Sequence, residues 1–500
     1  MEIKHKLISF VLIINLFSCS GGSESDESIE ATLPQITTKI ITSIDLSSAT
    51  SGGNVISNGN ATITQKGVCW STNPNPTISD SRTTEGAGNE EFTSDITGLS
   101  SDTEYFVRAY ATNSEGTAYG NELSFQTLVP ITPAFSVLKV VQNQQIRKMI
   151  PTSDGGYLGL VIGTDYEIQK FDAAFNQVWN KTYGGTSNDF ADDVIQTSDG
   201  GYLIIGRSDS NDGDVTNNYG ENDIWACKVD GLGNLEWERS YGGSGFEGLS
   251  GSGSVLEDNN NYYFVGFSDS QDGDLTSNKG GYDTWFVKID ASGNIVDQKT
   301  FGGSENDFGR KVIKTGTTYT ISILSNSSNG DFASDANLVV QLDSEINVVW
   351  SNSFSGINTG YLTATNNDEI VTVNCGVNEY YIDKISSAGN ITLSQTIDFT
   401  PFSDKQIGAR QIISLNDGGF FIIGSSGNGD NADAVLLRLD SNFNLLYHKI
   451  YAGSALELSS SIIPVGNDEY VYQFFTSSTN IPDITSSLPF SSPIISILEE

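Results

Sequence analysis

Two long acidic stretches of this chain have the residue types and spacing to bind a metal ion. Residues 208–225 read SDSNDGDVTNNYGENDIW and residues 268–285 read SDSQDGDLTSNKGGYDTW, with eleven of eighteen positions identical. The aspartates of the SDSNDGD and SDSQDGD segments that begin these stretches are candidate calcium ligands, because calcium takes hard oxygen atoms. They are Asp209, Asp212, Asp214, Asp269, Asp272 and Asp274. If they lie close together, a bound divalent cation would relieve their repulsion, so we expect calcium at millimolar concentration to stabilise the protein.

The alternative is that both stretches are solvated turns, in which Asp and Asn side chains bind the nearby backbone. They match the calcium loop of an EF-hand poorly. Aligning Gly213 with the invariant glycine puts Ser208 at the first ligand position and Tyr219 where the bidentate glutamate belongs. Repetition at a fixed length nevertheless argues against disorder, and long loops in compact domains are usually functional.

Other chemistries have weaker support. Beyond the N-terminal leader the one histidine is His448, which nearly excludes a nucleophile activated by histidine. Asp212 and Gly213 are adjacent, whereas the Asp-box of sialidases separates them by one residue, and no arginine triad stands out. The segment VDGLGNLEW is faintly similar to a quinoprotein repeat, but vicinal cysteines are lacking. A carboxylate pair for glycoside hydrolysis stays open, because acidic residues are abundant and none is singled out.

The N-terminus predicts export and lipidation. Residues 1–18 place Lys4 and Lys6 before LISFVLIINLF, which is typical of a signal peptide and too short to span a membrane. The ending LFSC resembles the lipobox of bacterial lipoproteins, which implies that Cys19 becomes the lipidated first residue. Plain cleavage and secretion is the alternative. Residues 19–32 form an acidic tether that we expect to be disordered, and they resemble the tag that sends some lipoproteins to the outer face of the outer membrane.

The charge of the chain restricts its partners. The formal net charge is −37, and loss of residues 1–18, which carry a net +1, makes it −38. Nucleic acid is therefore not expected as a partner, and the membrane is expected only through the lipid anchor. The cysteines beyond Cys19 are too few and scattered for a disulfide framework, so we expect Cys69, Cys227 and Cys375 to be buried small apolar side chains.

The composition predicts an all-β protein, with 52 glycines, only two methionines and no run of helical apolar spacing after the leader. The last third of residues 33–127 contains EYFVRAYAT, which alternates as a half-buried strand does. Leu99, Thr103 and Tyr105 have the spacing of a tyrosine corner, and the segment resembles a fibronectin type III domain. That resemblance implies a β-sandwich with Trp70 in its core and no catalytic chemistry. Residues 128–133 are the expected linker.

Residues 134–500 are periodic. A hairpin exemplified by SDGGYLGLVIG, SDGGYLIIG and NDGGFFIIG recurs seven times at intervals of 45 to 59 residues, each time followed by a second hairpin. Four strands per repeat predict a seven-bladed β-propeller. The last repeat ends at PIISILEE without a fourth strand, whereas AFSVLKVVQ, starting at Ala134, stands before the first repeat. We therefore expect this N-terminal strand to complete the last blade and close the ring.

Tryptophans recur at two positions of the repeat, and we expect all of them to pack between blades. Trp179, Trp237 and Trp350 follow the turn of the second hairpin, and Trp225 and Trp285 begin third strands. The repeats resemble those of secreted bacterial propellers that read DGGY, GNxxW and YGG. This resemblance implies an exported surface protein and no single activity.

The acidic stretches join the second and third strands of blades 2 and 3, and the connections between blades emerge on the same face. Besides the six aspartates, we expect this face to present Asp189, Glu247 and Asp307 as parts of a ligand-binding surface. The prediction is a monomeric, non-enzymatic surface lipoprotein of the outer membrane that binds a glycan or protein partner there. A polysaccharide-degrading enzyme on the same scaffold and a structural or adhesive envelope protein are the alternatives.

Overall fold

The computed structural model builds the chain from β-strands. It describes residues 30–500 apart from gaps at 129–132, 142–143, 252, 276, 333–335, 355–357, 377, 399–406, 428–431, 467, 479–480, 482–483, 485–491 and 500. The predicted signal peptide, Cys19 and most of the tether lie outside the described residues. In the part that is described, no helix has the length and hydropathy needed to cross a membrane. The chain divides into two compact units, residues 1–130 and 131–500, and the division falls within the predicted linker.

The first unit is a β-sandwich, as predicted. One sheet has the order β1-β2-β5 and the other β4-β3-β6-β7, with β8 also paired to β6. Its strands are β1 (Gln35–Thr38), β2 (Ser48–Ser57), β3 (Gln65–Ser71), β4 (Ser81–Arg82), β5 (Phe92–Thr97), β6 (Glu104–Asn113), β7 (Gly116–Tyr119) and β8 (Leu123–Gln126). The hydroxyl oxygen of Tyr105 accepts a hydrogen bond from Ser100 N at 3.0 Å, which is the back-bond expected of a tyrosine corner. Cys69 is buried, and Trp70 is partly buried against the edge of the core.

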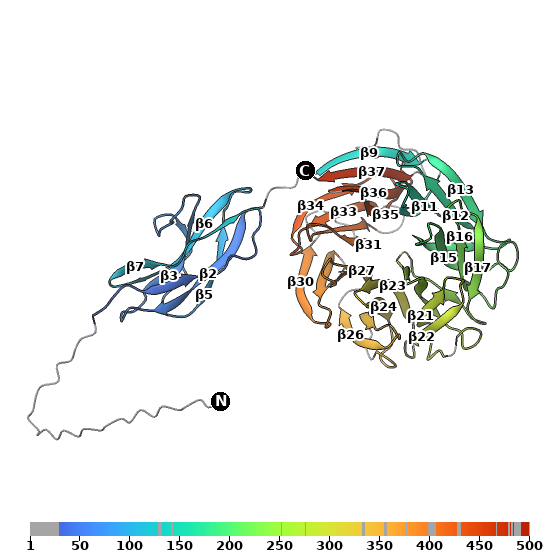
Figure 1. Cartoon of the computed structure of the whole chain (residues 1–500), viewed down its shortest axis with the longest axis horizontal. Coiled ribbons are helices and arrows are strands. Elements are labelled where there is room, and N and C mark those ends of the chain that lie inside the picture. Colours follow the sequence, from blue (N-terminus) through green and yellow to red (C-terminus); the bar gives the residue numbers. More distant parts are fainter. Residues whose placement is uncertain are drawn as a thin grey trace, which may run out of the picture. The chain divides into compact units, whose positions relative to one another are not determined.

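The described residues of the second unit form seven four-stranded antiparallel blades, arranged as a ring in Figure 1. Blade 1 comprises β10 (Ile146–Pro151), β11 (Tyr157–Val161), β12 (Tyr166–Phe171) and β13 (Gln177–Tyr183). Blade 2 comprises β14 (Asp189–Gln196), β15 (Tyr202–Ser208), β16 (Asp223–Val229) and β17 (Leu235–Tyr241). In blade 3 the inner strand is split into β18 (Glu247–Gly248) and β19 (Val255–Asp258), followed by β20 (Asn261–Ser268), β21 (Asp283–Asp290) and β22 (Ile295–Phe301).

The remaining blades repeat this order from the inner to the outer strand. Blade 4 comprises β23 (Asp307–Thr315), β24 (Thr318–Ser325), β25 (Asn337–Leu342) and β26 (Val348–Phe354). Blade 5 comprises β27 (Asn358–Ala364), β28 (Ile370–Cys375), β29 (Glu379–Ile385) and β30 (Ile391–Asp398). Blade 6 comprises β31 (Ile407–Ser414), β32 (Phe420–Ser426), β33 (Asp433–Leu439) and β34 (Leu445–Tyr451). Blade 7 comprises β35 (Glu457–Pro464), β36 (Glu469–Thr476), β37 (Ser492–Glu499) and β9 (Pro133–Val141).

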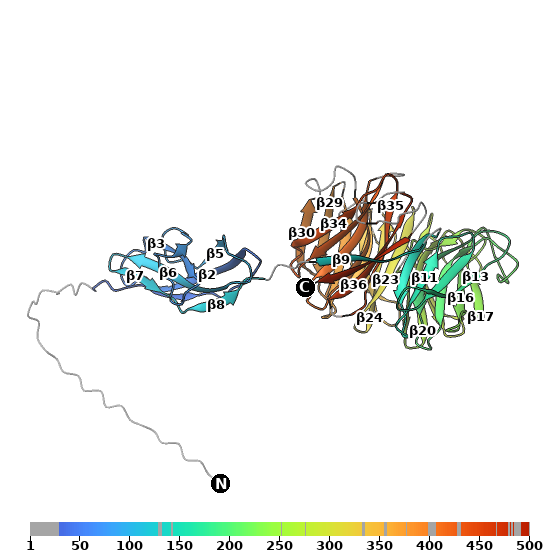
Figure 2. The same ribbon diagram turned by 90° about the horizontal axis from the view of Figure 1, so that it is seen from above.

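The ring closes between the two ends of this unit, which confirms the prediction. β9 pairs antiparallel with β37 in a register that runs from Ser492 opposite Val141 to Glu499 opposite Pro133. Figure 1 shows the two strands side by side, with β9 as the outer strand of the last blade, and Figure 2 shows the same blade from above, with β9 and β36 labelled. Closure removes the free edge that the C-terminal sheet would otherwise expose.

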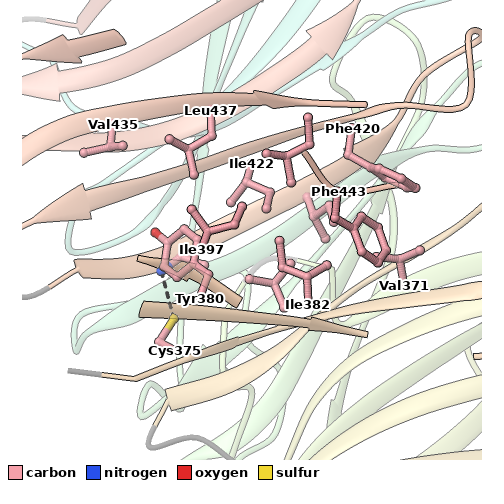
Figure 3. Packing of buried hydrophobic residues seen from close by; sticks show 14 residues of the cluster. Val371, Cys375, Tyr380, Ile382, Ile397, Phe420, Ile422, Val435, Leu437 and Phe443 are labelled. Carbon is pink, nitrogen blue, oxygen red and sulfur yellow. Dashed lines mark hydrogen bonds between the residues drawn. The ribbon is translucent and has the colours of Figure 1, made fainter. Parts of the chain in front are cut away.

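Apolar residues on the facing surfaces of neighbouring blades form the core. Figure 3 shows the cluster between blades 5 and 6, where Tyr380 and Ile382 meet Ile422 and Leu437. Trp225 and Trp285 are fully buried and pack against the preceding blade, as predicted. Each such large apolar side chain contributes about 1.5–3 kcal/mol of burial free energy, so the blades stabilise one another mainly through these clusters.

The DGG motif forms the turn between the first and second strands of a blade. In blade 2 the Asp199 carboxylate accepts a hydrogen bond from Gly201 N at 2.9 Å and lies 2.9 Å from the Lys228 ammonium on the third strand. Gly200 has a φ of 86°, and a Cβ at Gly201 would lie 2.3 Å from a backbone carbonyl oxygen. Both glycines are therefore required by the backbone, and the aspartate ties the turn to the blade.

Candidate functional site

The long acidic stretches and the connections between blades share one face of the ring, which we call the loop face. In blade 2, the aspartates of the stretch after β15 hold the connection that enters the blade. Asp212 accepts hydrogen bonds from Thr186 N at 2.7 Å and Thr186 Oγ1 at 2.9 Å, and Asp209 accepts one from Asn188 N at 2.6 Å. Asp214 accepts one from Gly184 N at 3.1 Å. The aspartates of this stretch thus act as acceptors for backbone N–H groups.

Blade 3 repeats these contacts residue by residue, which explains the repeated sequence. Asp269 accepts from Phe246 N at 2.6 Å, Asp272 from Ser244 N at 2.7 Å and Asp274 from Gly242 N at 3.2 Å. The glycine between the aspartates is also needed: Gly273 has a φ of 67°, and its Cβ would lie 2.3 Å from Gly242 O. The DGD turn therefore presses against the connection while its carboxylates bind the connection's N–H groups.

Blade 4 contains a third, less charged copy of the motif that the sequence comparison missed. Residues 325–332 read SNSSNGDF, and there Asn329 Oδ1 accepts a hydrogen bond from Ser304 N at 2.8 Å. Asp331 accepts one from Gly302 N at 3.1 Å. Since an amide oxygen serves at the position that Asp212 and Asp272 occupy in their blades, the position requires an acceptor rather than a charge.

This substitution leads to a stability prediction for Asp212. Asp212→Ala removes the acceptor of two hydrogen bonds and should lower the free energy of unfolding by about 1–3 kcal/mol. Asp212→Asn keeps an acceptor, as Asn329 does in blade 4, and should cost less than half as much. Thermal melts of the two variants provide the measurement. Equal losses would contradict the proposed role as an acceptor.

The three other acidic residues predicted for the ligand-binding face are buried, which corrects their expected exposure. Asp189, Glu247 and Asp307 are 0%, 0% and 1% exposed. Each accepts hydrogen bonds from serine hydroxyls of the following second strand or loop and from a glycine N–H of its connection, for example Gly303 N to Asp307 at 2.8 Å. They therefore anchor the start of each inner strand inside the domain.

Two of these buried carboxylates lie close to a second carboxyl group from the preceding blade. Asp223 is 0% exposed, and burial together with Glu247 raises its pKa to about 7. Asp283 stands in the same relation to Asp307, and burial raises its pKa to about 6. Because these pairs recur between blades and are enclosed, they have the placement of structural groups rather than of a substrate site.

Calcium binding by the acidic stretches stays a prediction. Over the described ranges, no three His, Cys, Asp or Glu side chains are placed to hold a metal ion. Calcium would have to compete with the N–H groups that the aspartates already bind. If calcium does bind, millimolar concentrations raise the melting temperature and the double change Asp212→Asn with Asp214→Asn removes most of that shift. Calorimetry without binding heat at millimolar calcium would contradict the prediction.

A second group of residues meets at the centre of the ring, where the inner strands line a channel. In six blades one residue of the inner strand is left without a partner on the neighbouring strand. Such a residue forms a β-bulge, and the bulge turns its side chain away from the blade. These residues are Arg147, Asp192, Arg310, Gly360, Arg410 and Ser460. In blade 3 the interruption is longer and separates β18 from β19.

The bulges bring positive charge together. Arg147 and Asp192 form an ion pair at 2.6 Å, and Lys148 pairs with Asp193. Three further cations, Arg310, Lys311 and Arg410, lack an ion-pair partner among the described residues. Burial, and then the charge of Lys148, lowers the pKa of Lys311 to about 8, although Asp193 opposes this shift.

Two connected hollows lie along the channel. The inner cavity, of about 160 Å³, is lined by Arg147, Arg310, Lys311, Tyr361, Arg410 and Ser460. A wider hollow of about 400 Å³ shares Arg147, Arg410 and Ser460 and adds Ile162, Leu456, Leu458 and Phe475. Leu456 lies in the connection between blades 6 and 7, and Ile162 directly follows the second strand of blade 1. Both positions are on the loop face, so the wider hollow is the mouth of the channel on that face.

The strand pairing decides the architecture. This is a β-propeller protein. No protein-family model matches the chain, and no curated protein sequence matches it.

Solved structures that it resembles include the Dos1 propeller, with 10% identity over 79% of this chain and 88% of that chain at a TM-score of 0.42. A quinoprotein alcohol dehydrogenase-like protein from Bacteroides thetaiotaomicron has 8% identity over 82% and 93% at 0.37. The PQQ-bound aldose sugar dehydrogenase from Streptomyces coelicolor has 11% identity over 74% and 99% at 0.38. At such identities and scores, these likenesses say nothing about the activity of this chain.

The sequence contains a signal for the channel residues. Aligning the inner strands places the pairs RK at 147–148, DD at 192–193, RK at 310–311 and RQ at 410–411 at one position of the repeat. The chain has only 25 Lys and Arg residues, so their recurrence at a single inner-strand position would have pointed to the channel.

Proposed function

We propose that this chain is a non-enzymatic binding protein of the cell surface, which takes a glycan or protein partner at the loop face of its propeller. The observation that supports this most is the channel mouth: a concave hollow of about 400 Å³ that combines apolar side chains with guanidinium and hydroxyl groups. Such a combination is typical of sites for small ligands and chain ends. A glycan end suits this hollow better than a flat protein surface does.

The hydrolytic alternative ranks second. Glycoside hydrolysis uses two carboxyl groups on either side of the scissile bond. The closely spaced carboxyl pairs, such as Asp223 with Glu247, are enclosed between blades, whereas the channel hollows present cationic, hydroxyl and apolar groups. These groups can hold a sugar, but the described residues that line the two hollows do not include the pair of carboxyl groups that the hydrolysis uses.

A glycan array probed with the mature chain tests the proposal, if both retention and newly formed reducing ends are scored. We expect retention without new ends. New reducing ends would support the enzyme, and the absence of both signals would support a structural or adhesive role; either result overturns the proposal. Leu456→Asp, at the mouth, should reduce retention, and Leu232→Asp, at an exposed turn between β16 and β17, is the matched control.

The surface location proposed here depends on lipidation at Cys19. In cells, Cys19→Ser should move the protein from the membrane fraction to the soluble fraction, because a single thioether-linked anchor would be lost. Fractionation combined with mass spectrometry of the N-terminal peptide measures this. A variant that stays with the membrane, together with an unlipidated wild type, would contradict the lipoprotein assignment. We expect the soluble form to be monomeric and to have no affinity for nucleic acid.

A further inference from the structure

The inner cavity of the channel concentrates positive charge in a strongly acidic protein. The chain has a net charge of −37, yet five cations and only two carboxylates meet at the bulges of the inner strands. The two carboxylates, Asp192 and Asp193, are already paired with Arg147 and Lys148. Arg310, Lys311 and Arg410 therefore carry charge in the channel without an ion-pair partner among the described residues.

The environment of Arg310 and Lys311 shows that this charge is only partly solvated. The Nε atom of Arg310 is buried and has no hydrogen-bond acceptor. The methylene chain of Lys311 packs over Gly253, where a Cβ would lie 2.8 Å from Cε of the lysine. Enclosed cationic groups without a partner are unfavourable, and a bound anion would relieve this cost.

We propose that the inner cavity is an oxyanion-binding site in which Arg310, Lys311 and Arg410 hold the acidic group of a glycan. This inference rests on the proposed function, since it names the ligand chemistry of the same channel. A sulfate ester and a uronate carboxylate offer the same negatively charged oxygen atoms, and guanidinium groups bind both through paired N–H donors.

The surroundings of the three cations fit such a group. The side chains of Tyr361 and Ser460 line the same cavity and add hydroxyl donors. Its volume of about 160 Å³ suits one acidic group or the acidic end of a sugar, while the wider mouth, with Leu456 and Phe475, can take the rest of the chain. Elsewhere on the loop face the aspartates of the acidic stretches repel anions, so the channel is the favourable place for them.

Isothermal titration of the mature chain with sodium sulfate tests the site without any glycan. We expect one binding site. Arg310→Gln and Arg410→Gln should each weaken binding about tenfold or more. The matched control is Arg239→Gln, which makes the same charge change on the exposed outer strand β17. Absence of sulfate binding, or equal weakening in the control, would overturn the proposal. If either arginine variant fails to fold by circular dichroism, Lys311→Gln replaces it with the same expectation.

The pH dependence of sulfate binding provides a second readout. Lys311 faces Lys148 and Asp193 across the blades and lies beside Arg310 and Tyr361. Since its pKa is about 8, sulfate affinity should fall as the pH rises from 7 to 9, and Lys311→Gln should remove this dependence. An unchanged pH dependence in the variant would count against a role of Lys311 in the site.

Two sugar ligands show whether the bound anion is a carboxylate or a sulfate ester. Comparison with the glycan array then separates the anion site from the proposed glycan-binding function. Glucuronate and glucose 6-sulfate distinguish carboxylate from sulfate ester, and neutral glucose is the blank. Sulfate binding without retention on the glycan array would uphold the anion site and reject the glycan-binding function. Glycan retention that Arg310→Gln and Arg410→Gln leave unchanged would uphold the function and reject the anion site.

Discussion

Deletion of residues 134–142 should prevent the propeller from forming a stable ring. These residues supply most of β9, which completes blade 7 by pairing with β37 along its whole length. Phe135 on β9 also packs edge-on against Tyr447 of blade 6, with ring centroids 6.2 Å apart. Each lost backbone hydrogen bond costs about 0.5–1.5 kcal/mol, and the open edge of β37 would promote aggregation.

The summed loss is comparable with the whole stability of a domain, about 5–15 kcal/mol. We therefore expect insoluble protein or a fall in melting temperature of about 15 °C or more. The control is deletion of residues 20–130, which removes the other compact unit and should leave the propeller's melting temperature nearly unchanged. Equal tolerance of both deletions would contradict ring closure by β9.

The second large effect is that the propeller should be more stable at pH 5 than at pH 7.5. Burial, together with Glu247, raises the pKa of Asp223 to about 7, and burial raises that of Asp283 to about 6. In the unfolded chain both carboxyls titrate near 4. Between these values the folded protein binds more protons than the unfolded chain does, so the free energy of unfolding falls as the pH rises.

A shift of one pKa unit corresponds to about 1.4 kcal/mol of stability. Because the titrations of Asp223 and Glu247 are coupled, we expect this pair to contribute about 2 kcal/mol to the pH dependence, which is less than the full shift of Asp223 would give. Hydrogen bonds from Thr152 and Lys170 lower the pKa of Asp154 to about 2, so the titration of Asp154 changes the free energy of unfolding only below pH 5. His448, whose pKa is lowered by burial, acts in the opposite direction.

Denaturant unfolding at pH 5, 6 and 7.5 measures the dependence, and Asp223→Asn with Asp283→Asn isolates its source. The double variant should lose most of the pH dependence, because the amides carry no titrating proton and occupy nearly the same volume. Arg239→Gln, on the outer surface, should keep the dependence of the wild type. A free energy of unfolding that rises from pH 5 to 7.5 in the wild type would contradict the assignment of these buried pairs.

Local patterns in the sequence were sufficient to predict the architecture. Alternating apolar residues, Gly-containing turns and a fixed period specify four-stranded blades because each of these features acts over a few neighbouring residues. Ring closure followed from counting strands, since one blade lacked its last strand and one strand lacked a blade. The burial of Trp225, Trp285, Cys227 and Cys375 was predictable because each blade is covered by its neighbours on both faces.

The same patterns did not reveal what the charged residues do. The aspartates of the acidic stretches suggested a metal site. Only the folded chain brings Asp212 to Thr186 N and Asn329 to Ser304 N, and each of these contacts joins the loop after a second strand to the connection that enters the same blade. The burial of Asp189, Glu247 and Asp307 likewise depends on packing between blades.

The channel depended entirely on tertiary structure. Arg147, Arg310 and Arg410 come from blades 1, 4 and 6, and nothing in their local sequence indicates that they meet. A bulge in the inner strand of each of these three blades turns the arginine side chain toward the axis, and closure of the ring then places the three side chains around one cavity. The sequence alone therefore determined the blades and their number, because short-range backbone preferences decide both; only the closed ring determined which charges share a site, because that depends on distances between blades.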